Sequence, residues 1–194
     1  MIKIGSRFQE LSQLIPEFEI LATPAIIATA NEIVRAFKSG NKLLICGNGG
    51  SAADSQHFAA EFVNAFSRDL DRKALPAIAL NTDTSVLTSI ANDFDFESTF
   101  SRQVLAYGKP GDVLFVITTS GSSKNCLNAV NVAKELGLIC ISLTKKGGEI
   151  SSLTQISITV PSQNTQHIQE CHMLACHVIT ELVEDELFRE GAKP

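Results

Sequence analysis

The sequence has no excess of basic residues. It carries 16 lysines and arginines against 21 aspartates and glutamates, for a formal net charge of −5, and charged residues make up only 19% of the chain. Proteins that bind nucleic acid through an open face need a concentration of positive charge opposite the phosphates. This balance disfavours such a face, whereas local cationic pockets remain compatible with it.

The sequence also lacks the cysteine patterns of a disulfide scaffold. Its five cysteines are odd in number, form no Cys-x-x-Cys pair and lie mostly inside apolar runs. They are Cys46, Cys126, Cys140, Cys171 and Cys176. We expect reduced core thiols in a cytoplasmic protein.

Long hydrophobic runs and linkers are missing as well. The start, "MIKIGSRFQE", has no basic region leading into an apolar stretch, and no run approaches the ~20 apolar residues that span a bilayer. The chain shows no low-complexity segment or charge block. We therefore expect a soluble protein with one domain over 1–194, large enough to bury roughly 70% of its unfolded surface.

Five short apolar runs without polar alternation predict strands covered on both faces. They span 42–46, 76–80, 112–117, 138–143 and 156–160. Helical spacing predicts helices between them at 52–66, 84–91, 97–107 and 123–136, the last stopped by Gly137. This alternation is typical of an α/β fold with a five-stranded parallel sheet and right-handed crossovers.

Helices are also expected at both ends of the α/β core, which we place at 41–165. Within 1–40, two helices are predicted at 7–15 and 24–38, with Pro24 in a first turn and Gly40 as a stop. One long helix is predicted within 166–190, from about 166 to 189.

Two loops after strands resemble each other: "GNGGSAAD" after the first and "TTSGSSKN" after the third. Each offers small residues, backbone N–H groups and hydroxyls at the positive end of a helix, which suits a phosphate oxygen. Serine and threonine are also ordinary helix caps. Four hydroxyls around one glycine favour the phosphate site: Thr119, Ser120, Ser122 and Ser123.

A dinucleotide fold is the alternative for the first loop, because Gly47, Gly49 and Ala52 fit the pattern G-x-G-x-x-A. That fold needs an acidic residue at the end of the second strand, about 20 residues further on. Position 71 lies in the polar stretch "SRDLDRK", and Asp83 comes 31 residues after Ala52. We therefore disfavour a nicotinamide dehydrogenase.

Every histidine lies in one of two segments. His57 shares a helix face with Glu61, four residues on, whereas His167, His172 and His177 fall in or beside the last predicted helix. A lone histidine on an apolar helix is usually a hydrogen-bonded core residue. A same-face carboxylate directly after a phosphate-type loop favours acid–base chemistry on a sugar phosphate, with a metal as an option.

Four segments carry a resemblance to a known family: "CGNGGSAADSQHFAAEF", "IANDFDFESTFSRQV", "TTSGSSKN" and "IQECHMLACHVI". In this order, over about residues 30–190, they resemble the phosphoheptose isomerases of the sugar isomerase (SIS) domain superfamily. The resemblance implies a single SIS-type domain. It also implies conversion of sedoheptulose 7-phosphate to D-glycero-D-manno-heptose 7-phosphate through an enediol. That is the first step of nucleotide-activated heptose biosynthesis, as for the lipopolysaccharide core.

The resemblance also implies one Zn(II) per subunit and a homotetramer with sites near the subunit interfaces. The implied metal ligands are His57, Glu61, Gln169 and His177, with Glu61 as catalytic base and His177 as general acid. The implied substrate contacts are Asn48, Gly49, Gly50, Glu61, Asn92, Asp93, Thr118, Thr119, Ser120, Ser123 and Gln169. Thr118 stands where the family often has serine and keeps the hydroxyl; "SAADS" lacks the histidine that some members carry after the first serine.

The implied metal set raises a geometric difficulty. Gln169 and His177 are eight residues apart, which on a helix means about 12 Å of rise and about 80° of rotation. Either the ion sits between them at the limit of their reach, or the ligands come from different subunits.

A non-catalytic sugar-phosphate-binding protein is the functional alternative, because fold does not fix function. The superfamily includes a relative that binds the bacterial replication initiator and resembles this chain through "LPAIALNTD" and "IAND". In that relative the positions matching Glu61 and His177 do not keep the acid–base pair. Both residues are present here, which favours the isomerase.

Overall fold

A five-stranded parallel sheet forms the centre of the molecule in a computed structural model that describes residues 2–189. The strand order is β2-β1-β3-β4-β5, and every neighbouring pair is parallel. The strands are β1 (Leu43–Gly47), β2 (Ala77–Ala79), β3 (Val113–Thr118), β4 (Ile139–Lys145) and β5 (Ile156–Val160). The predicted fold class and all five predicted strands are confirmed.

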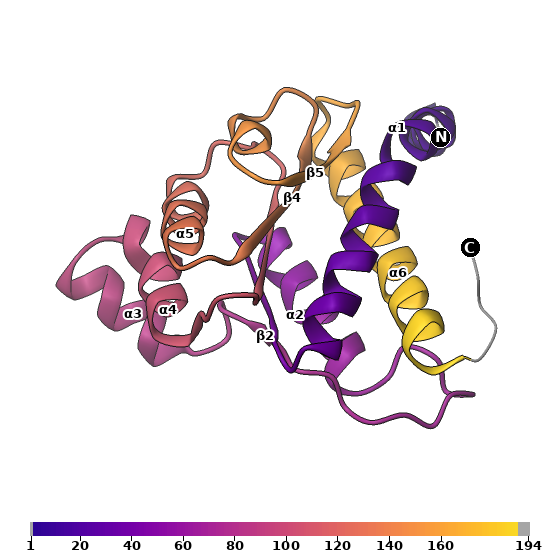
Figure 1. The fold of residues 1–194 in the computed structure, drawn as a ribbon. Coiled ribbons are helices and arrows are strands. Elements are labelled where there is room, and N and C mark those ends of the chain that lie inside the picture. Colours follow the sequence, from indigo (N-terminus) through magenta and orange to yellow (C-terminus); the bar gives the residue numbers. More distant parts are fainter. Residues whose placement is uncertain (1, 190–194) are drawn as a thin grey trace.

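Helices cover both faces of this sheet (Figure 1). They are α1 (Ile2–Lys38), α2 (Gly50–Val63), α3 (Thr84–Asp93), α4 (Thr99–Tyr107), α5 (Lys124–Glu135) and α6 (Thr165–Phe188), with 3-10 turns η1 (Phe96–Ser98) and η2 (Glu149–Ser152). Alternate strand residues face opposite layers, as the pleat requires. Leu43 and Ile45 pack in the core with α1, α2 and α6, whereas Leu44 and Cys46 pack with α4 and α5.

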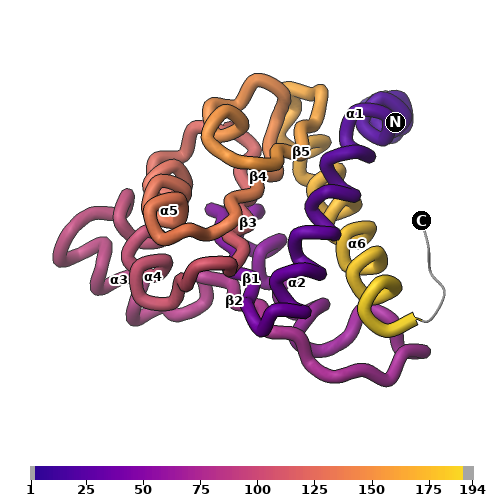
Figure 2. Tube along the Cα trace, viewed as in Figure 1, coloured from indigo at the N-terminus to yellow at the C-terminus, as the bar shows by residue number. Residues whose placement is uncertain are grey.

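The N-terminal helix corrects one prediction. The two helices expected at 7–15 and 24–38 form one 37-residue helix, and Pro24 lies in its interior rather than in a first turn. A proline removes one backbone hydrogen bond and tends to bend a helix. In Figure 2 the first turns of α1 are seen end-on while the later turns run across the view. Burial of one continuous face, including Phe18, Ala22 and Ile26, outweighs the lost bond.

Helix α1 also departs from the expectation that no segment approaches bilayer length. By length and composition alone, the stretch Lys3–Lys38 is apolar enough to cross a membrane. Core helices pass the same test, and Ala22 and Ile33 of α1 are fully buried against the rest of the fold. Other apolar side chains of α1 remain on the surface, among them Ile20, which is 77% exposed.

The four helices predicted between the strands correspond to α2, α3, α4 and α5, although α2 ends at Val63 instead of 66 and residues 97–98 belong to the turn η1. All five cysteines are free and buried. Helices α1 and α5 end just before Gly40 and Gly137, as the sequence indicated. The last helix, predicted from about 166 to 189, spans Thr165–Phe188 and so ends one residue earlier than predicted. Residue 190, the end of the predicted C-terminal segment, lies outside the described residues.

Candidate active site

Three side chains converge between α2 and α6. The Nε2 atom of His57 lies 2.9 Å from Oε1 of Glu61 and 3.2 Å from Nε2 of His177. The i, i+4 spacing placed the first two on one face, as predicted. Only the packing of α6 beside α2 brings His177 to them.

This cluster is open to a ligand and has the composition of a metal site. Side-chain exposure is 46% for His57 and 20% for Glu61. One donor atom from each of the three residues lies within 4.8 Å of the others. The three residues are therefore a candidate metal-binding group.

Gln169 lies near the start of α2. Its side chain packs on the first turn of α2, where its Nε2 lies 1.9 Å from the point that a Cβ on Gly50 would occupy. Gly50 precedes His57 by seven residues, about 10 Å along the helix. Any larger side chain at position 50 would displace Gln169.

Three hydroxyls form a triangle at the carboxyl end of β3. The Oγ1 of Thr118 lies 3.2 Å from Oγ of Ser120 and 3.4 Å from Oγ of Ser123, and the two serine oxygens are 3.3 Å apart. Ser123 is the N-cap residue of α5, yet its side chain makes no capping hydrogen bond. Ordinary capping therefore does not account for it, and the triangle is available to an anion at a helix N-terminus.

The loop after β3 depends on one glycine. Gly121 has a φ of 71°, and its N–H donates to Oγ1 of Thr118 over 3.2 Å. A Cβ on Gly121 would lie 2.4 Å from Cα of Gly148. Thr119 is half-buried in the same loop, and Ser122 is exposed.

A reciprocal amide pair ties the first loop to this triangle. Asn48 donates to Oδ1 of Asn125 over 2.8 Å, and Asn125 donates back to Oδ1 of Asn48 over 2.9 Å. Asn125 was missed by the sequence analysis, because only the alignment of Gly47 with Ile117 in neighbouring strands brings the two loops together. Its position in the first turn after the hydroxyl-rich loop was the one available signal.

The sequence and the fold match known proteins. The family model for the SIS domain matches residues 8–145. A phosphoheptose isomerase of Clostridium acetobutylicum is 54% identical over 159 residues, covering 81% of this chain and 80% of the relative. One of Citrifermentans bemidjiense is 46% identical over 192 residues, covering 98% and 99%. The solved structure of a phosphoheptose isomerase from Francisella tularensis superposes with a TM-score of 0.90 at 38% identity, covering 94% and 97%.

The chain belongs to the phosphoheptose isomerase family. This membership agrees with the resemblance in the sequence and removes the dinucleotide alternative. Asp83, the acidic residue considered for the dinucleotide fold, instead caps α3: its Oδ1 accepts the N–H of Val86 over 3.0 Å.

Two expected sugar contacts of a phosphoheptose isomerase lie apart from the rest in this chain. Asn92 and Asp93 end α3, are exposed, and pair with each other through a 2.9 Å hydrogen bond. Helix α3 lies across the sheet from α6 (Figure 1). Among the described residues, the structure records no hydrogen bond from either side chain to the other predicted site residues.

Two further titratable groups lie on the same helices. Asp54, one turn before His57, is half-buried; burial raises the pKa of its carboxyl, and the charge of His57 opposes this. His172 is fully buried, and burial lowers its pKa to about 4 although the adjacent Thr144 backbone favours the charged form. His172 is therefore an uncharged core residue at neutral pH.

Proposed function

We propose that this protein converts sedoheptulose 7-phosphate into D-glycero-D-manno-heptose 7-phosphate, an aldose–ketose isomerisation that starts the synthesis of nucleotide-activated heptoses. The observation that carries the proposal is the convergence of Glu61 and His177 at one exposed point in a chain of the phosphoheptose isomerase family. A carboxylate and an imidazole are the base and acid that this proton transfer requires.

Glu61 takes a proton from C1 of the ketose, and the same proton or one from solvent is returned to C2 of the resulting enediol. His177 supplies and removes the proton on the substrate oxygens. His57 lies 2.9 Å from the Glu61 carboxylate and is proposed below as a metal ligand beside it. The reaction needs no net oxidation, because the carbonyl and the alcohol exchange carbons.

The phosphate end of the sugar is bound by the loop after β3, through Thr118, Thr119, Ser120 and Ser123. Among the described residues, three of these hydroxyls form hydrogen bonds only with one another or with the loop backbone, which supports this assignment. When an anion binds, each hydroxyl can exchange such a contact for a stronger hydrogen bond to a charged oxygen. Asn48, Gly49 and Gly50 contact the sugar. An extended seven-carbon chain separates the phosphate from the reacting carbons, so separate sites for the two ends suit this substrate.

Zn(II) is the metal that we propose for the three-residue cluster. His57, Glu61 and His177 would hold it, with Gln169 as the fourth ligand expected from the family. Two imidazole nitrogens and a carboxylate oxygen at the observed separations suit this ion. Bound there, it would polarise the substrate carbonyl as a Lewis acid.

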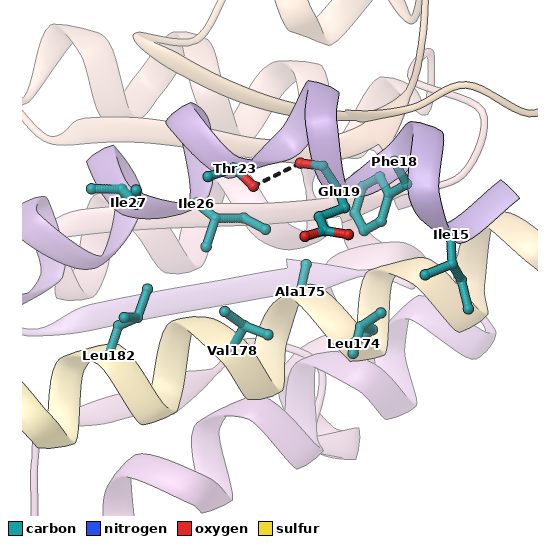
Figure 3. Close-up of a pocket in the computed structure, with 10 residues that line it drawn as sticks. All are labelled: Ile15, Phe18, Glu19, Thr23, Ile26, Ile27, Leu174, Ala175, Val178 and Leu182. Carbon is teal, nitrogen blue, oxygen red and sulfur yellow. Dashed lines mark hydrogen bonds between the residues drawn. The ribbon is translucent and has the colours of Figure 1, made fainter. Parts of the chain in front are cut away.

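We further propose that the protein is a cytoplasmic homotetramer with active sites near subunit contacts. An apolar groove between α1 and α6 supports the assembly (Figure 3). It is lined by Ile15, Phe18, Glu19, Thr23, Ile26, Ile27, Leu174, Ala175, Val178 and Leu182. Surfaces of this kind usually mark protein interfaces. A second copy there could bring residues such as Asn92, Asp93 and Gln169 to a shared site, and the five buried free thiols suit a reducing compartment.

The direct test is incubation of the purified protein with sedoheptulose 7-phosphate, followed by NMR detection of the aldose product. We expect turnover, and light scattering should give the mass of four chains. Binding of the sugar phosphate without turnover, with and without added Zn(II), would support the non-catalytic alternative instead.

A further inference from the structure

A buried ion pair lies behind the three-residue cluster. The Nε of Arg72, in the segment between α2 and β2, is 2.6 Å from Oε1 of Glu184 on α6. Their side chains are 0% and 2% exposed. A pair this buried loses most of its hydration, so it adds little stability compared with apolar packing. The hydrogen-bond partners of the two side chains are more informative about their role than their contribution to stability is.

Arg72 holds the end of the helix that carries the proposed base. Its Nη2 donates to the carbonyl of Glu61 over 2.7 Å, and its Nη1 donates to the carbonyl of Phe62 over 2.9 Å. The last carbonyls of a helix have no partner within that helix. The guanidinium therefore fixes the C-terminal turn of α2, in which Glu61 lies.

Glu184 holds the segment that touches the proposed acid. Its two carboxylate oxygens accept the N–H groups of Phe66 and Ser67 over 2.9 and 3.2 Å. This places the ring of Phe66 5.9 Å from the ring of His177. Glu184 follows His177 by seven residues, two turns further along the same face of α6.

We propose that Arg72 and Glu184 are positioning residues that set the carboxylate of Glu61 against the imidazole of His177. Neither touches the substrate. The pair joins the end of α2, the Phe66 segment and α6 at one point, so the distance between base and acid depends on it. This inference rests on the proposed isomerase function.

The chain contains a matched control for a purely structural role. Asp112 is 1% exposed and lies 2.5 Å from Nζ of Lys42. Like Glu184, it accepts two backbone N–H groups, those of Lys42 and Lys109, over 3.0 and 2.8 Å. This second pair lies at the amino ends of β1 and β3. The loops of the proposed site follow the carboxyl ends of the strands, on the opposite side of the molecule from this pair.

The first test compares Glu184→Gln with Asp112→Asn in steady-state kinetics, each corrected for its folded fraction. A small displacement of a catalytic group can cost up to about 100-fold in rate, so we expect kcat of Glu184→Gln to fall about 10- to 100-fold. KM should change less than about threefold, and Asp112→Asn should keep kcat within about twofold of wild type. Equal losses in the two variants would overturn the positioning role.

Arg72→Lys keeps the buried charge balanced and serves if Glu184→Gln does not fold. Lysine cannot reproduce the planar fork that reaches Glu184 and both carbonyls at once. We expect kcat to fall about tenfold or more, because the end of α2 loses its anchor. Wild-type kcat in a folded Arg72→Lys protein would overturn the proposal.

A structural measurement separates this inference from the proposed function. In protein labelled with carbon-13 in its histidine rings, the NMR signal of His177 should shift in Glu184→Gln and Arg72→Lys, because Phe66 moves, and should stay in place in Asp112→Asn. An unchanged His177 signal would overturn the positioning role even if activity fell. Wild-type protein without turnover would instead overturn the proposed function, and with it this role.

Discussion

The Nε2 atoms of His57 and His177 lie 3.2 Å apart, across 120 residues of sequence. Two neutral imidazoles can share only one proton at such a contact, and two protonated rings would repel each other. A divalent cation satisfies both nitrogens together with Glu61. The contact therefore suits a shared metal ion as well as a single N–H···N hydrogen bond.

Zn(II) binding tests this contact. We expect about one ion per chain by calorimetry, a rise in the melting temperature through linkage, and reversal by a chelator. His57→Gln should bind zinc at least about tenfold more weakly, as the loss of a ligand implies. The control is His167→Gln, because His167 pairs with Glu10 and Glu170 instead. Wild-type zinc affinity in His57→Gln would contradict the assignment.

Glu61→Gln removes the proposed base and nearly preserves its shape. We expect turnover to fall at least about 100-fold, with binding of the phosphorylated sugar largely retained. Glu186→Gln is the control, because Glu186 is a partly exposed carboxylate of α6 paired with Lys38. Steady-state rates and sugar-phosphate titrations measure the two effects, and near-normal turnover would remove Glu61 from the mechanism.

The route of the proton is tested by turnover in heavy water. If Glu61 takes the C1 proton and an enediol forms, that proton can exchange before its return, so NMR should detect deuterium at C2 of the aldose. Partial labelling fits a closed site that returns some original protons before they exchange. A complete absence of label, with turnover unaffected in Glu61→Gln, would exclude the base role.

The hydroxyl triangle should bind phosphate rather than stabilise the fold. Replacing Ser120 and Ser123 together with alanine should weaken binding of the sugar phosphate, since each lost hydrogen bond to a charged oxygen contributes about 1.5–3 kcal/mol. The melting temperature should change little. Ser122→Ala is the control, because this exposed hydroxyl lies in the same loop outside the triangle. Unchanged affinity in the double variant would place the phosphate elsewhere, such as the loop from Asn48 to Ser51.

Acid should destabilise the fold through His172. Burial lowers its pKa to about 4, whereas an unfolded chain takes up the proton near 6.5. As the pH falls from about 6.5 to about 4, only the unfolded state gains this proton, so the free energy of unfolding falls by roughly 3 kcal/mol. Urea unfolding across this range should show the slope, and His172→Phe should reduce it. An equal slope in His172→Phe would assign the acid sensitivity to other groups.

The sequence by itself determined the local structure. Apolar runs without polar alternation gave the five strands, because a strand covered on both faces must be apolar throughout. Helical spacing put His57 and Glu61 on one face, since a helix repeats every 3.6 residues. These signals depend only on residues that are close together in the sequence, so they can be recognised without knowing the fold. Pro24 was the exception: its local preference for a first turn gave way to the burial of one face of α1.

The tertiary structure alone decided which distant side chains meet. Helices α2 and α6 run in the same direction, with Gly50 beside Gln169 and His57 beside His177. No periodicity within either helix fixes that register, because it results from packing both helices on one face of the sheet. The pairing of Arg72 with Glu184 depends on the same packing, which buries both charges and leaves each without water as an alternative partner.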